Sequence, residues 1–502
     1  MFEGESRTHD YLEKLFEENG PIVALGKIKN RFCSVLTEPD SYRKLVSSLG
    51  LDDAVMSLLR LGDAVAIESF HGDDSRRELI RSKAFHLSAL RQGNAYFAWR
   101  RGRRFLRRNP LEPIADAASN FSVQVQLPGF TNAHEVNFNF QRDELIRNRI
   151  AVLIGRNGVG KTQLFLSMIK ALVPSAPLDL TGQILAEAKF DPVPSFNSLL
   201  VFSSTFADPY PQRIHPWEGG IDYQYFSIIG RAPHQYSVDA DELTGGLIDI
   251  VRSDDLFDPQ EGGNYSKKRR IDILWMALES YLDLESVFLP IASGTPPAVW
   301  KTSRPDGTYV ALQWLNGEQR RLEITHSLDW TRPPIILKDG NQHRLSSGQL
   351  AMFRFAVQAI GAVSTGSLLL LDEPETHLHP NFISVFVNIL HEILAATGSC
   401  AIIATHSAYI VREVPRSRVR VISVEDDSVE VSQPRLQTFG ASVDSISQFV
   451  FGDTEVKHLH QILLKNWLGN EASIEDVLSK YGEELNPERL LYIRRIMDEG
   501  QD

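Results

Sequence analysis

A glycine-rich octet behind a run of apolar residues restricts the fold of this chain more than any other feature. Residues 150–154, IAVLI, have the composition of a fully buried strand, and residues 155–162 follow with the sequence GRNGVGKT. Glycines let the backbone wrap tightly, so that several N–H groups point at phosphate oxygens. A helix that begins near Lys161 adds the positive end of its dipole. The pattern predicts a phosphate-binding loop between a strand and a helix of an α/β fold.

The polar groups of this loop have expected tasks with ATP and Mg²⁺ as ligands. The Lys161 ammonium is within reach of the β- and γ-phosphates, and the Thr162 hydroxyl is a ligand for Mg²⁺. A glycine-rich turn that matches the octet by chance is the alternative, and the flanking strand and helix argue against it. The residues expected to line the nucleotide are Gly155, Arg156, Asn157, Gly158, Gly160, Lys161, Thr162 and Gln163.

A second apolar run, SLLLL at residues 367–371, ends in two consecutive carboxylates. A carboxylate at the C-terminal end of a parallel strand lies beside the phosphate loop. We therefore expect Asp372 to hold Mg²⁺, directly or through water, and Glu373 to polarise the attacking water. The same residues fit an acidic strand-to-loop turn when they are taken alone, and the phosphate loop favours the catalytic interpretation.

Two further segments carry groups that can contact a phosphate. Ser346 is expected to cap the helix that follows it, and a capped helix N-terminus binds anions, although it also occurs without a ligand. A third apolar run, residues 401–405, ends at His406, which can donate to a γ-phosphate oxygen or serve a structural purpose. The expected contacts from the helix N-terminus are Ser346, Ser347, Gly348 and Gln349.

In this order, the four motifs resemble the head of an ABC-type ATPase, with a P-loop sheet, covering helices and an antiparallel β subdomain. They are a Walker A loop at 155–162, a signature at 345–349, a Walker B strand at 368–373 and a switch histidine at His406. The resemblance covers residues 115–453 and implies slow ATP hydrolysis by a head-to-tail homodimer or a higher homo-oligomer. It implies that Ser346 and Gly348 of one copy contact the γ-phosphate held by Lys161 of the other.

The residues after Walker B narrow the resemblance. ABC transporter subunits continue with a Thr-Ser-Ala-Leu-Asp type of sequence, whereas residues 375–380 read ETHLHP. This segment is similar to the non-transporter branch, which includes RecF, the SMC proteins, the OLD nucleases and bacterial anti-phage ATPases. Residues 203–208, 223–226 and 438–446 are similar to the anti-phage group, in particular to the Septu ATPase subunit PtuA and its retron-associated relatives. Ser203 or Ser204 is the candidate γ-phosphate sensor.

The rest of the chain divides into regions with weaker signals. Residues 1–110 are expected to be mainly helical and residues 454–502 to form a helical tail, while residues 210–335 are expected to be an irregular insertion with a helix at 267–289. Alternation predicts an antiparallel strand pair at 121–127 and 135–140, and a hairpin turn at 425–427 is favoured over a metal cluster. The absence of sustained heptads before the signature predicts a compact head without coiled-coil arms.

The composition of the chain indicates where the protein works and which partners we expect. The chain has 502 residues with two cysteines and no run long and apolar enough for a membrane span, so we expect a cytoplasmic protein without a membrane partner. Arginines mixed with aromatic residues suit contact with DNA or RNA, and a solvated face is the alternative on a chain with net charge −12. The candidate nucleic-acid contacts are Arg100, Arg101, Arg103 and Arg104.

No nuclease motif stands out, and the residues after Gly452 are too few for the Toprim domain that OLD nucleases carry. We therefore expect an ATP-dependent sensor subunit of a bacterial anti-phage complex that controls a separate effector nuclease of the HNH type. A RecF-like DNA-repair ATPase that binds DNA ends or gaps is the alternative. A transporter subunit is a third interpretation, which the segment after Walker B disfavours.

Overall fold

The computed structural model describes most of the chain between residues 8 and 451, and the expected tail at 454–502 lies outside the described residues. Two units, Met1–Val443 and Asp444–Asp502, are each considered by themselves. The longer described stretches are 8–24, 31–70, 74–82, 120–141, 149–173, 186–204, 209–211, 221–228, 268–294, 298–316, 334–376 and 378–451, with residue 28 and shorter pieces between 85 and 106, 246 and 257, and 324 and 332.

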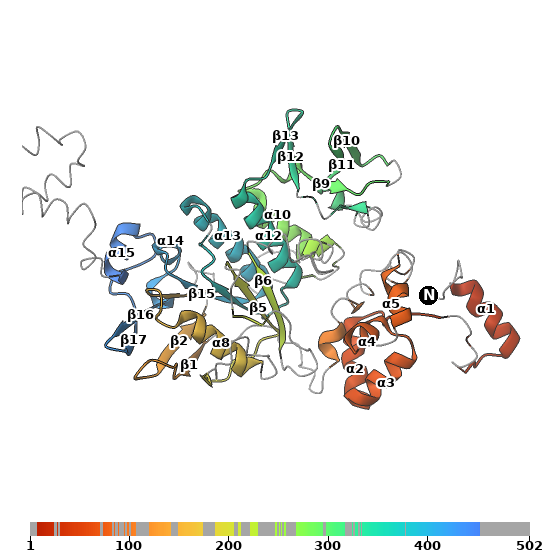
Figure 1. The fold of residues 1–502 in the computed structure, drawn as a ribbon, viewed down its shortest axis with the longest axis horizontal. Coiled ribbons are helices and arrows are strands. Elements are labelled where there is room, and N and C mark those ends of the chain that lie inside the picture. The colour runs from red at the N-terminus through yellow and green to blue at the C-terminus, as the bar shows by residue number, and fades with distance from the viewer. Residues whose placement is uncertain are drawn as a thin grey trace, which may run out of the picture. The chain divides into compact units, whose positions relative to one another are not determined.

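A seven-stranded sheet in the order β17-β16-β3-β15-β14-β5-β6 forms the centre of the first unit (Figure 1). Neighbouring strands from β16 to β6 are parallel, and β17 pairs antiparallel with β16. The predicted α/β fold is confirmed, as are the buried strands before the phosphate loop, before the two carboxylates and before His406. The strands are β3 (Ile150–Ile154), β5 (Ser198–Ser203), β6 (Asp222–Ser227), β14 (Leu368–Asp372), β15 (Cys400–Thr405), β16 (Val419–Glu425) and β17 (Ser428–Ser432).

The order of the strands brings the motifs to one edge of the sheet. Strand β15 lies between β3 and β14, and β14 in turn pairs with β5. The registers align Asp372 with Ala404 on one side and with Ser203 on the other. Because these strands are parallel, their C-terminal ends share an edge, where ligands of open α/β sheets bind. The loops after β3, β5, β14 and β15 therefore meet there.

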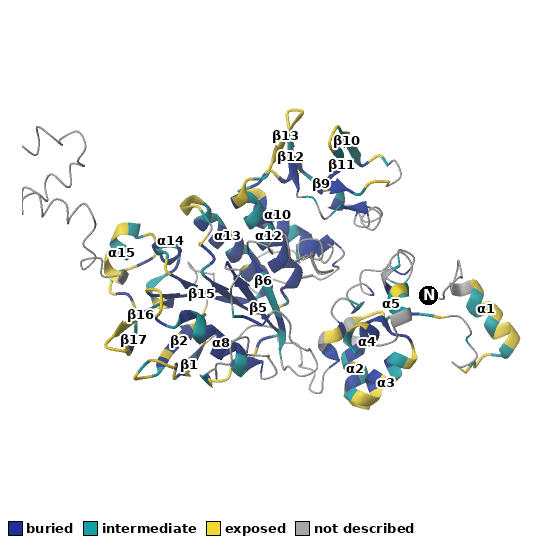
Figure 2. Cartoon of the chain, viewed as in Figure 1, coloured by how far each residue is buried: buried dark blue, intermediate teal, exposed yellow. Residues whose placement is uncertain are grey.

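One face of the sheet packs against α8 (Lys161–Leu172) and a three-stranded antiparallel sheet in the order β2-β1-β4. Inward-facing residues alternate along β1 and β2, which fills one continuous core (Figure 2). The predicted antiparallel pair is confirmed, and a third short strand joins it. The strands of this smaller sheet are β1 (Asn120–Val125), β2 (His134–Asn139) and β4 (Lys189–Asp191).

The other face carries α12 (Ser347–Ala362) and α13 (Pro380–Thr397). A chain of rings joins the layers: the ring centroids of Phe202 and Phe355 are 5.1 Å apart, and those of Phe355 and Phe386 are 4.6 Å apart. Among the described residues, α13 is the one helix long and apolar enough to cross a membrane by length and composition, with a mean hydropathy of 1.2 and half of the stretch buried. Buried core helices meet the same criterion, and α13 packs against α10 (Arg270–Glu279) and α12.

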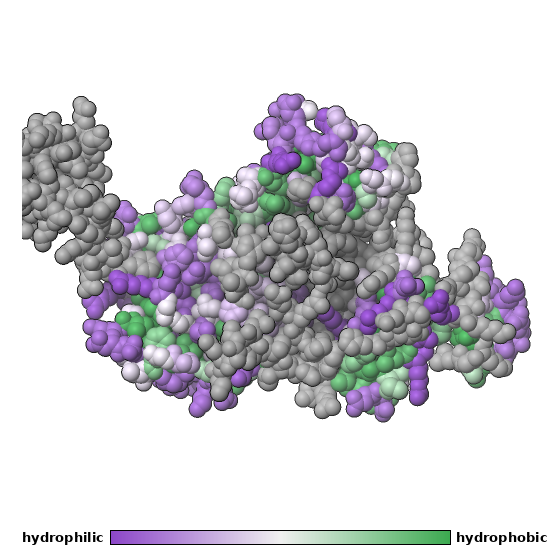
Figure 3. All heavy atoms as spheres, in the orientation of Figure 1, coloured by the Kyte–Doolittle hydropathy of each residue, from purple (hydrophilic) through white to green (hydrophobic). Residues whose placement is uncertain are grey.

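The described part of the region 210–335 is more regular than expected. The helix predicted over 267–289 is wrong in its second half: α10 ends at Glu279, a short turn η3 (Leu284–Ser286) follows, and residues 287–291 form a strand. Short apolar runs such as VFLPI fit a helix or a strand equally well by pattern. This strand is the middle of a five-stranded antiparallel sheet, β10-β11-β9-β12-β13, whose β12–β13 tip is hydrophilic (Figure 3). Its strands are β9 (Val287–Ile291), β10 (Lys301–Arg304), β11 (Gly307–Ala311), β12 (Ile335–Lys338) and β13 (Asn341–Arg344).

The described residues of the N-terminal region lie mostly in helices. Asp63 caps α4 by accepting from the Ala66 N–H at 3.0 Å and also accepts from the Tyr42 hydroxyl at 2.8 Å. Apolar Leu49, Met56 and Leu61 are exposed over α2 and α3 (Figure 3). The helices are α1 (Thr8–Asn19), α2 (Pro39–Leu49), α3 (Leu51–Arg60), α4 (Ala64–Ser69), α5 (Asp74–Arg81) and the 3-10 turn η2 (Gly102–Phe105).

Smaller elements complete the described chain. Asp426 and Asp427 have φ angles of 48° and 61° between β16 and β17, as a tight hairpin turn requires, so the predicted hairpin is confirmed. The remaining elements are β7 (Leu256–Phe257), β8 (Lys268–Arg269), η4 (Leu312–Asn316), α14 (Ala408–Val411), η5 (Arg416–Arg418) and α15 (Val443–Phe451).

Candidate nucleotide-binding site

The loop between β3 and α8 has the backbone that its glycines allow. Gly158 and Gly160 adopt φ angles of 87° and 93°, in the left-handed region that side chains other than glycine rarely occupy. A Cβ atom on Gly160 would also lie 2.7 Å from a methyl group of Leu127 and 3.0 Å from Nε2 of His134. The octet therefore forms the tight turn that the sequence predicts, and Gly160 is required there by conformation and by space.

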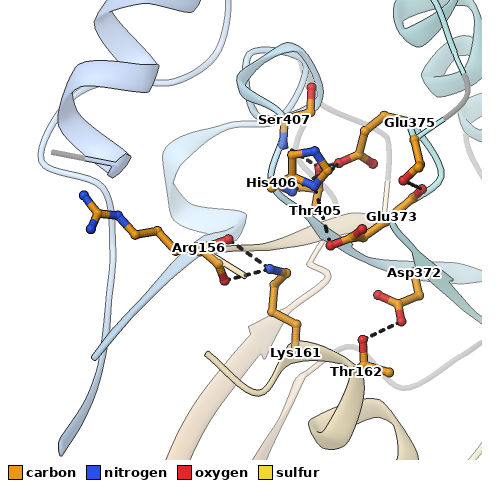
Figure 4. Close-up of polar contacts among 11 residues, drawn as sticks. Arg156, Lys161, Thr162, Asp372, Glu373, Glu375, Thr405, His406 and Ser407 are labelled. Carbon is orange, nitrogen blue, oxygen red and sulfur yellow. Dashed lines mark hydrogen bonds and ion pairs between the residues drawn. The ribbon is translucent and has the colours of Figure 1, made fainter. Parts of the chain in front are cut away.

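Lys161 lies inside this turn and is only 6% exposed. Its ammonium donates to the carbonyl oxygens of Gly155 at 2.9 Å and Arg156 at 3.1 Å (Figure 4). Burial lowers the pKa of Lys161, and the nearby charges of Glu373, Asp372 and Glu375 act in the opposite direction. The ammonium is therefore bonded to the loop and lies in the electrostatic field of the carboxylates that follow β14.

Asp372 is buried beside the loop and accepts two hydrogen bonds on the same oxygen. The Thr162 hydroxyl donates to Oδ2 at 2.8 Å, and the Tyr210 hydroxyl donates to it at 2.6 Å. The other oxygen, Oδ1, is buried and has no hydrogen-bond partner among the described residues. Burial raises the pKa of Asp372, and the hydrogen bonds from Tyr210 and Thr162 act in the opposite direction. A carboxylate and a hydroxyl beside a phosphate loop fit the donor set that Mg²⁺ prefers.

Glu373 follows in a strained backbone conformation. Its φ angle is 45°, and its N–H donates to the carbonyl of Ala404 in the neighbouring strand at 2.8 Å. Positive φ angles at residues other than glycine cost energy and cluster at functional sites. The side chain is 27% exposed, with Oε1 3.5 Å from Nδ1 of His406. Glu373 is thus held at the sheet edge with its carboxylate partly exposed.

Glu375 is part of the site, although the sequence reading assigned it no role. It is buried, and its Oε1 accepts hydrogen bonds from the Thr405 hydroxyl and from the His406 N–H, the latter at 3.1 Å (Figure 4). The same oxygen lies 3.4 Å from Nδ1 of His406. Burial raises the pKa of Glu375, and these hydrogen bonds oppose the shift. Glu375 therefore fixes the end of β15 and the side of the imidazole ring that carries Nδ1.

The signature residues form the N-terminus of α12. Ser346 Oγ accepts from the Gln349 N–H at 3.2 Å, and Gln349 Oε1 accepts from the Ser346 N–H at 2.9 Å, so the two make a reciprocal capping box. The predicted cap is confirmed, and the side chain of Gln349 is used within it. Gly348 is buried, and a Cβ there would lie 2.5 Å from the Phe382 ring, whereas Ser346 and Ser347 are exposed.

The other residues expected to line the nucleotide differ in how far they are exposed. Arg156, Asn157 and Gly158 are exposed around the loop, Gly155 is buried against the carbonyl of Ile422, and Gln163 is half-buried on α8.

The two serines at the end of β5 are both buried, and Ser204 Oγ has no hydrogen-bond partner in the part of the chain that is described. Arg103 is exposed in η2 and Arg104 belongs to the same turn, while Arg100 and Arg101 lie outside the described residues.

His134 is another residue that the sequence did not single out. It is fully buried on β2, and its Nε2 lies 2.9 Å from the carbonyl of Val159 in the phosphate loop. Its Nδ1 is buried without a hydrogen-bond partner among the residues described, so Nε2 carries the proton and donates to this carbonyl. Burial lowers the pKa of His134, which favours this neutral form. A histidine at the start of a strand is no signal by itself, because its partner is distant in the sequence.

One stretch of the chain is similar to a described family. Residues 338–412, which include the signature and Walker B, match the family "AAA domain, putative AbiEii toxin, Type IV TA system". Protein ea59 of Escherichia phage lambda is 25% identical over 407 residues, which cover 78% of this chain and 71% of that protein. The matched stretch includes Ser346, Asp372 and His406 of the site described above.

Several solved structures show a limited similarity to the chain. The ATP-binding cassette MJ1267 of an ABC transporter is 12% identical with a TM-score of 0.30 and covers 69% of this chain and 99% of its own. The SMC head domain from Thermotoga maritima is 9% identical with a TM-score of 0.30 and covers 64% and 100%, respectively. UvrA2 from Deinococcus radiodurans is 15% identical with a TM-score of 0.32 and covers 70% and 42%.

Proposed function

We propose that this chain is the ATP-binding and hydrolysing sensor subunit of a bacterial anti-phage complex. In this proposal, two copies pair head to tail around ATP and control a separate effector nuclease. One observation carries the pairing. Ser346 and Ser347 are exposed at the capped N-terminus of α12, while Lys161, Asp372 and Glu373 lie near one another beside the phosphate loop. The phosphate site of one copy is completed when a second copy supplies the signature residues, and the same holds in reverse.

The proposed chemistry assigns one task to each group. Lys161 and the loop N–H groups hold the phosphates, and Thr162 with Asp372 would hold Mg²⁺, which when bound would screen the charge of the β- and γ-phosphates. Glu373 accepts the proton of the attacking water. Glu375 keeps Nδ1 of His406 on the carboxylate side, so that Nε2 is the nitrogen left to face a phosphate. Ser346 and Ser347 of the second copy approach the γ-phosphate from the opposite side.

The similar proteins support a function in phage infection together with a separate partner. The description of the matching family names a putative AbiEii toxin and a Type IV TA system, which supports a chain that works with a separate partner. The relative ea59 comes from a phage, which supports a setting in phage infection. The segment after Walker B and the residues 438–446 support the Septu-like branch, in which the partner is a nuclease.

A plaque assay tests this proposal. Cells that carry the chain with its neighbouring reading frames should resist phage, and cells in which the chain carries Lys161→Ala should lose that resistance, because ATP no longer binds. The purified chain should cut neither plasmid, linear DNA nor tRNA. Equal plaque numbers with wild type and Lys161→Ala would contradict the defence role. Hydrolysis that DNA stimulates without any partner would instead favour the RecF-like alternative.

A further inference from the structure

Tyr210 makes a contact with the proposed metal site that no sequence motif predicts. Its side chain is fully buried in the core beside the sheet, and its ring centroid lies 6.2 Å from that of Tyr225 on β6. Its hydroxyl donates to Oδ2 of Asp372 at 2.6 Å, a shorter distance than the 2.8 Å of the Thr162 contact. The residue therefore reaches the Walker B carboxylate from the loop between β5 and β6, on a different element from the phosphate loop.

These two donors determine how the carboxylate is oriented. Both end on Oδ2, so rotation of the carboxylate would break two hydrogen bonds at once. The remaining oxygen, Oδ1, is buried and has no hydrogen-bond partner within the described part of the chain. A buried, unpaired carboxylate oxygen is costly unless a ligand completes it. The pair of donors thus presents Oδ1 as the oxygen that remains for a cation.

We propose that Tyr210 is a positioning residue for the divalent metal of the ATP site, and that it acts by holding Asp372 with Oδ1 toward the metal. The proposal rests on the proposed function of Asp372 in binding Mg²⁺. Tyr210 touches neither the nucleotide nor the metal in this account. Residues that orient a metal ligand typically contribute about 10- to 100-fold in metal affinity or activity. Loss of the hydroxyl alone should therefore weaken the metal more than it weakens the nucleotide.

The matched variants are Tyr210→Phe and Tyr223→Phe. Tyr223 lies on β6 in the same core, and its buried hydroxyl has no hydrogen-bond partner among the described residues. Each change removes one buried hydroxyl and keeps the ring, so their effects on packing are comparable. The probe is Mn²⁺, titrated into ATP-loaded protein and followed by electron paramagnetic resonance of the free ion. ATP affinity in EDTA, measured on each variant, reports whether the nucleotide site is still folded.

Tyr210→Phe should weaken Mn²⁺ binding by about 10-fold or more, while Tyr223→Phe matches wild type and both keep their ATP affinity in EDTA. Equal Mn²⁺ affinity in all three proteins would overturn the proposal. Tighter binding in Tyr210→Phe would also overturn it, because the hydroxyl would then compete with the metal. Asp372→Asn tests the proposed metal site separately from the positioning role of Tyr210. If it lowers Mn²⁺ affinity while Tyr210→Phe does not, only the positioning role fails; if it has no effect, the proposed metal site fails as well.

Discussion

Replacing Lys161 with alanine should abolish ATP binding. The side chain is buried inside the phosphate loop, where its ammonium is held by two loop carbonyls and faces the carboxylates of Asp372 and Glu373. Removing it leaves the β- and γ-phosphates next to those carboxylates without the cation that compensates them. Equilibrium binding of a fluorescent ATP analogue measures the effect.

Lys170→Ala provides the control for this loss. Lys170 lies in the last turn of the same helix, α8, away from the loop at its first turn. The control should bind the analogue as wild type does. This result would show that α8 tolerates the loss of a lysine outside the phosphate loop. Wild-type affinity in Lys161→Ala would mean that the nucleotide binds elsewhere.

Glu373→Gln should still bind ATP but hydrolyse it at least ~100-fold more slowly, the scale of a lost general base. The amide keeps the shape of the side chain and its strained backbone, but it cannot accept a proton from water. Because hydrolysis is blocked after the two copies have closed on ATP, the variant should also accumulate as a dimer. Phosphate release and light scattering during size-exclusion chromatography measure the two effects.

Glu430→Gln, on the exposed hairpin strand β17, is the matched control and should turn over ATP at the wild-type rate. Undiminished hydrolysis by Glu373→Gln would move the base elsewhere. His406 is then the first candidate, because its Nδ1 lies within 3.5 Å of the Glu373 carboxylate at the same sheet edge.

The parts of the fold that could be predicted are those with local signals. Buried apolar runs such as IAVLI and SLLLL predict strands, and the polar residues that end them mark the edge where ligands bind. Ser346 with Gln349 three residues later is a local signature of a helix start, and the capping box forms as expected. Each of these signals lies within one short stretch of the chain.

The parts of the fold and of the site that could not be predicted depend on contacts between residues that are distant in the sequence. Tyr210 and Asp372 are separated by 162 positions, and Glu375 meets Thr405 across 30, so neither contact leaves a local pattern. The helix predicted over 267–289 runs into the strand Val287–Ile291, because these five residues are too few for their periodicity to distinguish a helix from a strand. The strand takes its form from β11 and β12, which pair with it on either side.

The shared site gives a direct test of the account. Ser346→Arg should prevent hydrolysis without preventing ATP binding by the single chain, because Ser346 acts on the nucleotide of the other copy. Lys161→Ala is inactive for the opposite reason, since it keeps an intact signature and lacks a working phosphate loop. The arginine also removes a helix cap, at a cost of about 1 kcal/mol, so thermal unfolding must show that this variant is folded.

Mixing the two inactive variants is the decisive measurement. Each heterodimer would contain one site with an intact phosphate loop opposite an intact signature, and a second site with neither. With random pairing, the mixture should recover about a quarter of the wild-type ATPase rate per chain, because half of the dimers are mixed and each has one working site. A mixture that stays as inactive as its two components, although both are folded and exchange subunits, would contradict the head-to-tail site.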